Sequence, residues 1–111
     1  MNIHTASYFH LRDHVGESFC ISRTQPYLYP ELVFLYPSSD LLYQYRHGII
    51  NWEQYSQEYN DLLELRSDLI EIELNQMEYD DITLCCWERK VEHCHRVLAA
   101  YFISNNFSKS S

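Results

Sequence analysis

The sequence predicts a small α/β domain in which a mostly parallel sheet of three or four strands is flanked by helices. Three observations lead to this fold class. Short apolar runs at residues 17–22 and 82–86 are typical of strands. Longer segments carry apolar residues at helical spacing. The chain has only two glycines and three prolines, which is too few for a turn-rich all-β fold.

Length and composition favour one domain. The chain has 111 residues, of which 46% are hydrophobic, enough for a modest core and too many for wholesale disorder. We expect a single α/β domain over residues 1–106 and a flexible tail over residues 107–111. The ten tyrosines can fill an interior with their rings and keep a hydroxyl group at its edge.

The N-terminal third is predicted to hold two strands. A short strand at residues 2–5 is followed by a turn of helix at 7–12. The second strand, at 17–22, is the better candidate because it is rich in apolar and small residues. Two prolines then interrupt regular structure, and residues 32–36 form a third apolar run.

Helices are predicted in the middle of the chain. Ser38 or Ser39 can cap the first one, and Gly48 can end it. Asn51, followed three residues later by Gln54, is typical of a capping box that begins the next helix. Helical spacing then continues to about residue 77, as one long helix or two consecutive ones.

The C-terminal part is predicted to form a strand and a helix. A turn at residues 80–81 precedes the strand at 82–86, and the last helix covers about residues 94–104. The apolar spacing in this helix predicts one buried stripe, made of Val97, Leu98, Tyr101 and Phe102.

Charge limits the partners that we expect. The formal net charge is −8, which opposes direct nucleic-acid binding over a broad surface. Ten of the sixteen acidic residues lie within residues 53–81, where Arg66 is the only cation. This acidic helical segment is interpreted as a solvated face or as a surface that binds a basic protein or mimics nucleic acid.

The sequence also bears on location. It has no secretory pattern at its start and no apolar stretch that could span a membrane. Four cysteines without an export signal indicate a reducing, cytoplasmic environment rather than a disulfide framework. We therefore expect a cytoplasmic protein with no membrane segment.

Residues 86–96 carry the strongest chemical signal. They hold two thiols, two imidazoles, two carboxylates and three cations between a strand and a helix. Amide groups at a helix start carry partial positive charge and favour anions. Arg96 can form a fork on a phosphate or carboxylate, and His95 can donate to an anion or move a proton. Arg23, at the end of another predicted strand, would reach the same rim.

Three other interpretations of this segment stay open. Arg96 could simply pair with a nearby carboxylate at a surface helix start. Cys86, Cys94 and the histidines could bind a metal, although the spacing lacks paired C-x-x-C knuckles and neighbouring Cys85 and Cys86 should face opposite sides of a strand. Cys86 and Cys94 could instead form a reversible disulfide. The Cys-x5-Arg loop of phosphatases is absent.

These residues resemble a known family. The run from Ile82 to Arg89 followed by Cys94-His95-Arg96 is similar to the C-terminal signature of the "domain of unknown function 488" family. Weaker likenesses at residues 21–26, 36–45 and 52–59 extend the resemblance over nearly the whole chain. It implies a small α/β fold with one site formed by Cys86, Glu88, Cys94, His95 and Arg96, with Arg23 joining it, and says little about activity.

The functional hypothesis is a small enzyme or ligand-binding domain for an anionic compound such as a nucleotide or another phosphorylated metabolite. Arg23 and Arg96 would bind the anion. Cys86 or Cys94 would be the nucleophile, activated by His95. Glu88 would be the general acid/base or would orient His95. No metal or cofactor is assigned. The alternatives are an acidic interaction protein and a thiol- or metal-linked sensor.

Overall fold

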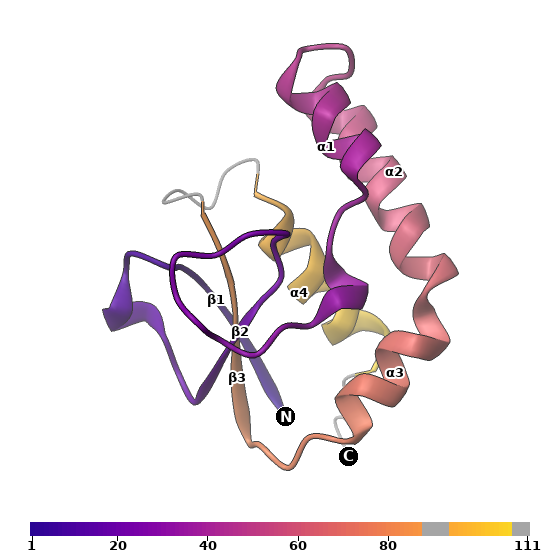
Figure 1. Cartoon of the computed structure of the whole chain (residues 1–111). Coiled ribbons are helices and arrows are strands. Elements are labelled where there is room, and N and C mark those ends of the chain that lie inside the picture. The colour runs from indigo at the N-terminus through magenta and orange to yellow at the C-terminus, as the bar shows by residue number, and fades with distance from the viewer. Residues whose placement is uncertain (88–93, 108–111) are drawn as a thin grey trace.

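In a computed structural model of the chain, which describes residues 1–87 and 94–107, three parallel strands form the sheet (Figure 1). They are β1 (Asn2–Ser7), β2 (Glu17–Cys20) and β3 (Asp81–Cys86), in the order β1-β3-β2. The last strand in the sequence is therefore the central one. Its backbone pairs on both sides, and from Ile82 onward every one of its residues is buried.

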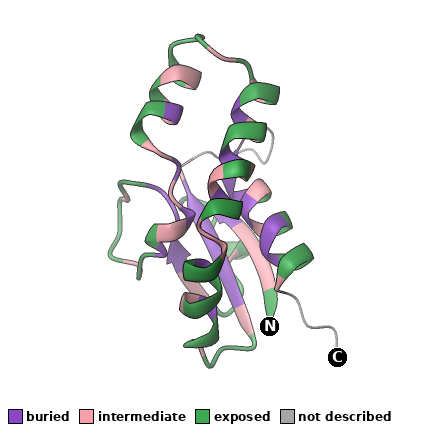
Figure 2. Ribbon diagram, turned by 90° about the vertical axis from the view of Figure 1, so that its right-hand side faces the viewer, coloured by how far each residue is buried: buried purple, intermediate pink, exposed green. Residues whose placement is uncertain are grey.

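Two helices form a hairpin that stands away from the sheet in Figures 1 and 2. Helix α1 (Ser39–Arg46) is capped by Ser38, whose hydroxyl accepts from the Leu41 amide at 3.1 Å. Gly48 follows the helix with φ of 70°, a conformation that favours glycine. Helix α2 (Trp52–Leu65) begins with the predicted capping box of Asn51 and Gln54.

The predicted helical segment to residue 77 is two helices. Arg66 ends α2 and begins α3 (Ser67–Asn75). The guanidinium group of Arg66 donates to the carbonyl oxygens of Phe34 at 3.1 Å and Tyr36 at 2.6 Å. Arg66, the only cation within residues 53–81, is thus directed inward. It joins the segment between β2 and α1 to the helices α2 and α3.

Rings fill the space between α1 and α2. Tyr45 lies 5.6 Å from Trp52 and 4.9 Å from Tyr55 between ring centroids, and Tyr55 stacks on Tyr59 at 6.1 Å. Tyr59 is fully buried, and its hydroxyl donates to the Leu35 carbonyl at 2.6 Å. Such offset and tilted pairs add about 0.5–1.5 kcal/mol each beyond the area that they bury.

Helix α4 (His95–Asn106) covers the sheet and packs on β1, β3 and α2. The predicted buried stripe of this helix is half right, because Phe102 is buried and Leu98 packs against the core. Val97 and Tyr101 are 40% and 71% exposed. The buried face also includes two polar residues. The sequence pattern did not predict them, because apolar spacing gives no weight to a buried arginine or histidine. Its members are His95, Arg96, Ala99, Phe102 and Ile103.

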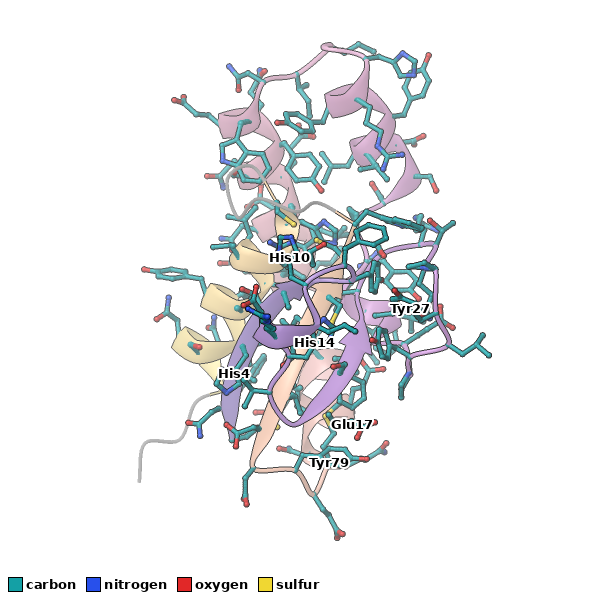
Figure 3. The ribbon with its side chains drawn as sticks, turned by 90° about the vertical axis from the view of Figure 1, so that its left-hand side faces the viewer. His4, His10, His14, Glu17, Tyr27 and Tyr79 are labelled. Atoms are coloured by element: carbon teal, nitrogen blue, oxygen red, sulfur yellow. The ribbon has the colours of Figure 1, made fainter. Side chains whose placement is uncertain are left out.

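The opposite face of β3 is covered by the short connection from β1 to β2. Strand β1 extends to Ser7, and the helical turn is a 3-10 turn, η1 (Leu11–Asp13), slightly later than predicted. Thr83 on β3 donates to the Val15 carbonyl at 2.7 Å and accepts from the Val15 amide at 2.8 Å. Figure 3 shows His14 on this side of the sheet.

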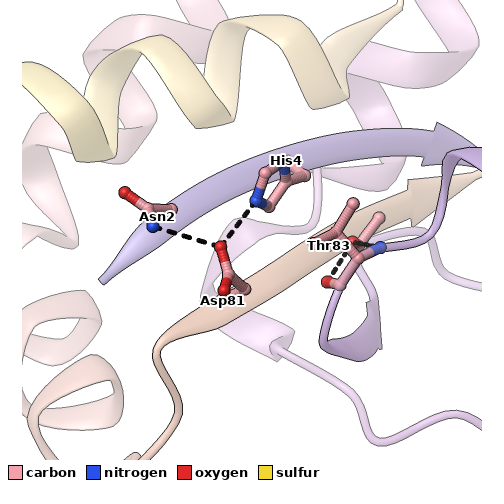
Figure 4. Close-up of polar contacts among 5 residues, drawn as sticks. Asn2, His4, Asp81 and Thr83 are labelled. Carbon is pink, nitrogen blue, oxygen red and sulfur yellow. Dashed lines mark hydrogen bonds and ion pairs between the residues drawn. The ribbon is translucent and has the colours of Figure 1, made fainter.

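Asp81 holds the beginning of β1 against β3. Its carboxylate accepts from Asn2 at 3.1 Å and contacts the His4 ring nitrogen at 2.9 Å (Figure 4). The hydrogen bond from His4, followed by that from Asn2, lowers the pKa of Asp81. A lowered carboxyl pKa stabilises the folded state above the ordinary pKa and loses this contribution as pH falls through the lowered value.

Two other predicted boundaries shift. Strand β2 ends at Cys20, two residues early, and the apolar run at 32–36 forms a second 3-10 turn, η2 (Val33–Leu35). Glu31 makes an isolated parallel bridge with Cys20, so this run begins beside β2 without adding a strand. No helix in the described ranges 1–87 and 94–107 is long and apolar enough to cross a lipid bilayer.

The two glycines give a matched test of the contact between the β1–β2 connection and β3. Both have positive φ, 67° for Gly16 and 70° for Gly48. A Cβ on Gly16 would lie 2.1 Å from the Asp81 carbonyl oxygen, whereas a Cβ on Gly48 would meet nothing within 4 Å. Gly48→Ala should therefore cost only the left-handed penalty, about 1–2 kcal/mol.

Gly16→Ala should cost at least about 2 kcal/mol more than Gly48→Ala, because the backbone at Asp81 must also move. Urea unfolding followed by circular dichroism measures both variants. Equal losses in the two variants would contradict the close approach of residue 16 to β3.

Candidate functional site

The carboxyl ends of the three strands meet at one edge of the sheet. Ser7 is the register partner of Cys86, and Cys20 is that of Cys85. Two backbone hydrogen bonds extend this pairing past the strands, from the Tyr8 amide to Cys86 and from the Ile21 amide to Cys85. The residues that follow each strand are therefore brought together, as in other open parallel sheets that bind ligands at this edge.

A cavity of about 200 Å³ opens at this edge. Its lining combines cationic, aromatic and hydroxyl-bearing side chains from α1, α4 and the segments that follow β2 and β3. They include Ser22, Arg23, Thr24, Arg46, Trp87 and His95.

Larger hollows lie elsewhere, such as one of about 330 Å³ beside Ile3 and one of about 450 Å³ beside Phe19. None of their described lining residues is an arginine, lysine or histidine. We therefore place the candidate site at the smaller, cationic cavity.

A chain of hydrogen bonds fixes one wall of the cavity. The Tyr8 hydroxyl lies 2.6 Å from the Ser22 hydroxyl, which donates to the Thr24 carbonyl at 2.6 Å. The Trp87 indole donates to the same Thr24 carbonyl at 2.9 Å. Burial raises the pKa of Tyr8, so its hydroxyl keeps its proton. The wall is thus joined across the ends of all three strands.

The two arginines of the cavity come from different elements. Arg23 follows β2, and its Nε donates to the Pro37 carbonyl at 3.1 Å, which orients the guanidinium group. Arg46 lies in the last turn of α1. Among residues 1–87 and 94–107, no carboxylate forms an ion pair with either arginine.

A second cluster lies at the start of α4 and is buried. Arg96, which is 2% exposed, donates through Nη1 to Cys86 Sγ at 3.2 Å and to Cys94 Sγ at 3.5 Å. His95 is 5% exposed, and its Nε2 lies 2.8 Å from the Ile21 carbonyl oxygen. The ring of His95 packs edge-on against Tyr59, with centroids 5.7 Å apart.

The predicted site residues thus separate into two groups. Arg23 and His95 line the cavity. Cys86, Cys94 and Arg96 are buried beside one another, and none of them is among its described lining residues. Glu88 lies outside the described residues.

The sequence interpretation missed Arg46. Its position two residues before Gly48, in the last turn of a predicted helix, is the only sequence signal that marks it. A cation there is common at any helix end, so this signal alone does not point to a site.

The other two cysteines, Cys85 on β3 and Cys20 on β2, lie on the opposite face of the sheet from Cys86. Cys85 and Cys20 cluster with Tyr8, and Cys85 Sγ is 3.8 Å from His14 Nδ1. Burial raises the pKa of the Cys85 thiol to about 11, so it remains protonated at neutral pH. As the strand alternation predicts, adjacent Cys85 and Cys86 serve different clusters.

Fold and site together define an α/β protein with a cationic cavity at the carboxyl edge of a parallel sheet. The family model DUF488-N3a, described as the active DUF488-N3 subclade, matches residues 22–106. The chain therefore belongs to the DUF488 family, which confirms the resemblance read from its sequence. No curated protein and no solved structure matches the chain significantly.

Burial of the thiols leads to a prediction. All four cysteines are buried, so a thiol reagent such as dithionitrobenzoate should react with the native protein at least about 100-fold more slowly than with the unfolded chain, because each reaction requires local opening. Stopped-flow absorbance in native buffer and in guanidinium measures both rates. One fast native thiol, assigned by peptide mass spectrometry to Cys86 or Cys94, would contradict this and support a nucleophile at that position.

Proposed function

We propose that this protein binds a small phosphorylated anion, a nucleotide or another phosphorylated metabolite, in the cavity at the carboxyl edge of its sheet. The observation that carries the proposal is that Arg23, Arg46 and His95 line the same cavity although they come from three separate parts of the chain. Two converging arginines on a protein with a net charge of −8 are best explained by an anionic ligand.

The arginines suit a phosphate group. A guanidinium group can donate two parallel hydrogen bonds to a phosphate. Arg23 is oriented through Nε by Pro37, so its two Nη groups are available to a ligand. The start of α4, at His95, adds the partial positive charge of a helix N-terminus at the same edge.

The size and wall of the cavity limit the ligand. A cavity of about 200 Å³ is smaller than most drug-sized sites, which begin at about 300 Å³. It suits a phosphorylated fragment or the phosphate end of a nucleotide. The indole of Trp87, held by its two hydrogen bonds to Thr24, lines the cavity. A base that stacked on this ring would gain about 1–3 kcal/mol.

His95 is the member of the predicted catalytic set that reaches the cavity wall in the described structure. A carbonyl oxygen only accepts, so His95 Nε2 carries a hydrogen and donates to Ile21. This bond fixes the ring orientation. The role that we propose for His95 is to form part of the cavity wall beside the arginines that bind the anion. A nucleophilic role for Cys86 or Cys94 would require their exposure.

Binding of phosphate compounds tests the proposal. Isothermal titration with inorganic phosphate, pyrophosphate and AMP should show binding to the wild type. Arg23→Gln and Arg46→Gln should each weaken it by roughly 10–100-fold, since a charged hydrogen bond contributes about 1.5–3 kcal/mol. Arg12→Gln, at an exposed arginine on η1, is the matched control and should bind normally. Equal binding by all three variants, or none by the wild type, would refute the anion site.

A second candidate function is recognition of a basic protein segment by the surface of α2 and α3. Its specific support is the inward direction of Arg66. Within the described part of the chain, no lysine or arginine forms an ion pair with the acids of this segment. The same surface exposes Leu65, Leu69 and Ile72, at 85%, 46% and 55%. Leu69 and Ile72, three residues apart in α3, lie along one side of that helix, and Leu65 is the last residue of α2. An amphipathic basic helix fits this mixture.

Charge reversal tests this surface. An amphipathic Lys/Leu peptide should bind the wild type at low salt, and the triple variant Glu64→Lys/Asp68→Lys/Glu71→Lys should abolish the interaction because attraction becomes repulsion. Fluorescence anisotropy of the labelled peptide measures it, and phosphate binding in the cavity is the control that should not change. Retention of peptide binding in the triple variant would exclude the acidic surface as its site.

A further inference from the structure

Three potential metal ligands meet at the start of α4. Cys86 is the last residue of β3, Cys94 is the N-cap residue of α4, and His95 is its first residue. One ligand atom from each lies within 4.8 Å of the other two. Their side chains are buried, with exposures of 0%, 1% and 5%. Two sulfur atoms and an imidazole nitrogen at this separation could close around one ion without movement of a strand or helix.

The hydrogen bond of His95 suits metal binding. Because Nε2 donates to the Ile21 carbonyl at 2.8 Å, the lone pair of the neutral ring is on Nδ1. Metal-binding histidines commonly donate their other ring N–H to a carbonyl or carboxylate, which fixes the tautomer and the direction of the ligating nitrogen. This outer contact comes from the end of β2 and therefore depends on the folded sheet.

Arg96 provides a second outer contact. Its Nη1 donates to the sulfur atoms of both Cys86 and Cys94. Sulfur bound to a metal as thiolate keeps lone pairs that can accept such hydrogen bonds. Two thiolates also balance the charge of a divalent cation, so Arg96 and the ion need not exclude each other.

We propose that Cys86, Cys94 and His95 bind a zinc ion. Soft thiolate ligands with an imidazole favour zinc over magnesium or calcium, which prefer oxygen. The described residues 1–87 and 94–107 supply three protein ligands, so a fourth tetrahedral position is left for water or another ligand. This inference is independent of the anion proposal, although His95 takes part in both.

The sequence spacing does not suggest this site. The two cysteines are separated by seven residues, unlike the short knuckles of common zinc motifs. The fold brings the two cysteines together, because β3 ends beside the first turn of α4.

The test uses the full chain, stripped with chelator and then loaded with Zn²⁺ or Co²⁺. After gel filtration, mass spectrometry of the metal content should give one zinc per chain, and the cobalt form should show thiolate charge-transfer and tetrahedral d–d absorption. Cys94→Ser and Cys86→Ser should lose zinc affinity by more than the roughly 10–100-fold that removal of an outer contact costs. Cys85→Ser and Cys20→Ser, on the opposite face of the sheet, are matched controls that should keep the metal.

Several outcomes would overturn the zinc site: no bound metal, no thiolate absorption in the cobalt form, or equal metal loss in the Cys85→Ser control. Circular dichroism establishes that each variant folds. If Cys86→Ser or Cys94→Ser unfolds, the wild-type cobalt spectrum and the two control variants still decide the question. Arg23→Gln and Arg46→Gln should keep zinc while losing phosphate, so failure of one proposal can be distinguished from failure of the other.

Discussion

The parallel pairing of β3 on both sides is the constraint on which the rest of the structure depends. A central parallel strand is buried on both faces and needs a connection over each of them. Here the short β1–β2 connection covers one face and α4 covers the other. Because all three strands run in the same direction, their carboxyl ends meet at one edge. The polar side chains that follow the strands gather there.

Successive side chains of β3 point to opposite faces of the sheet, so its two cysteines lie in different clusters. Cys85 points to the face of Tyr8 and Cys20, where burial keeps its thiol protonated. Cys86 points to the face of α4, where Arg96 donates to its sulfur. Two adjacent cysteines therefore have different environments for one geometric reason, the twofold period of a strand.

The cavity and the buried cluster of Cys86, Cys94, His95 and Arg96 are neighbours that share His95. The cavity wall is built by hydrogen bonds across the strand ends, and its two arginines come from the segment after β2 and from α1. In the buried cluster, Arg96 at the start of α4 donates to Cys86 at the end of β3 and to Cys94. The match to the DUF488 family model covers residues 22–106 and therefore includes the residues of both sites. Anion binding and metal binding at this edge are separate proposals, each with its own variants.

The sequence by itself determined the local structure and the family. Capping residues such as Ser38 and Asn51 fixed helix starts, because they bond to amides only three residues away. The Cys-His-Arg signature identified the family, and the site that it predicts at the carboxyl edge of the sheet stays a prediction. Tertiary structure alone decided the strand order, the buried face of α4 and the entry of Arg46 into the cavity. These depend on contacts between residues far apart in the chain, which local spacing does not encode.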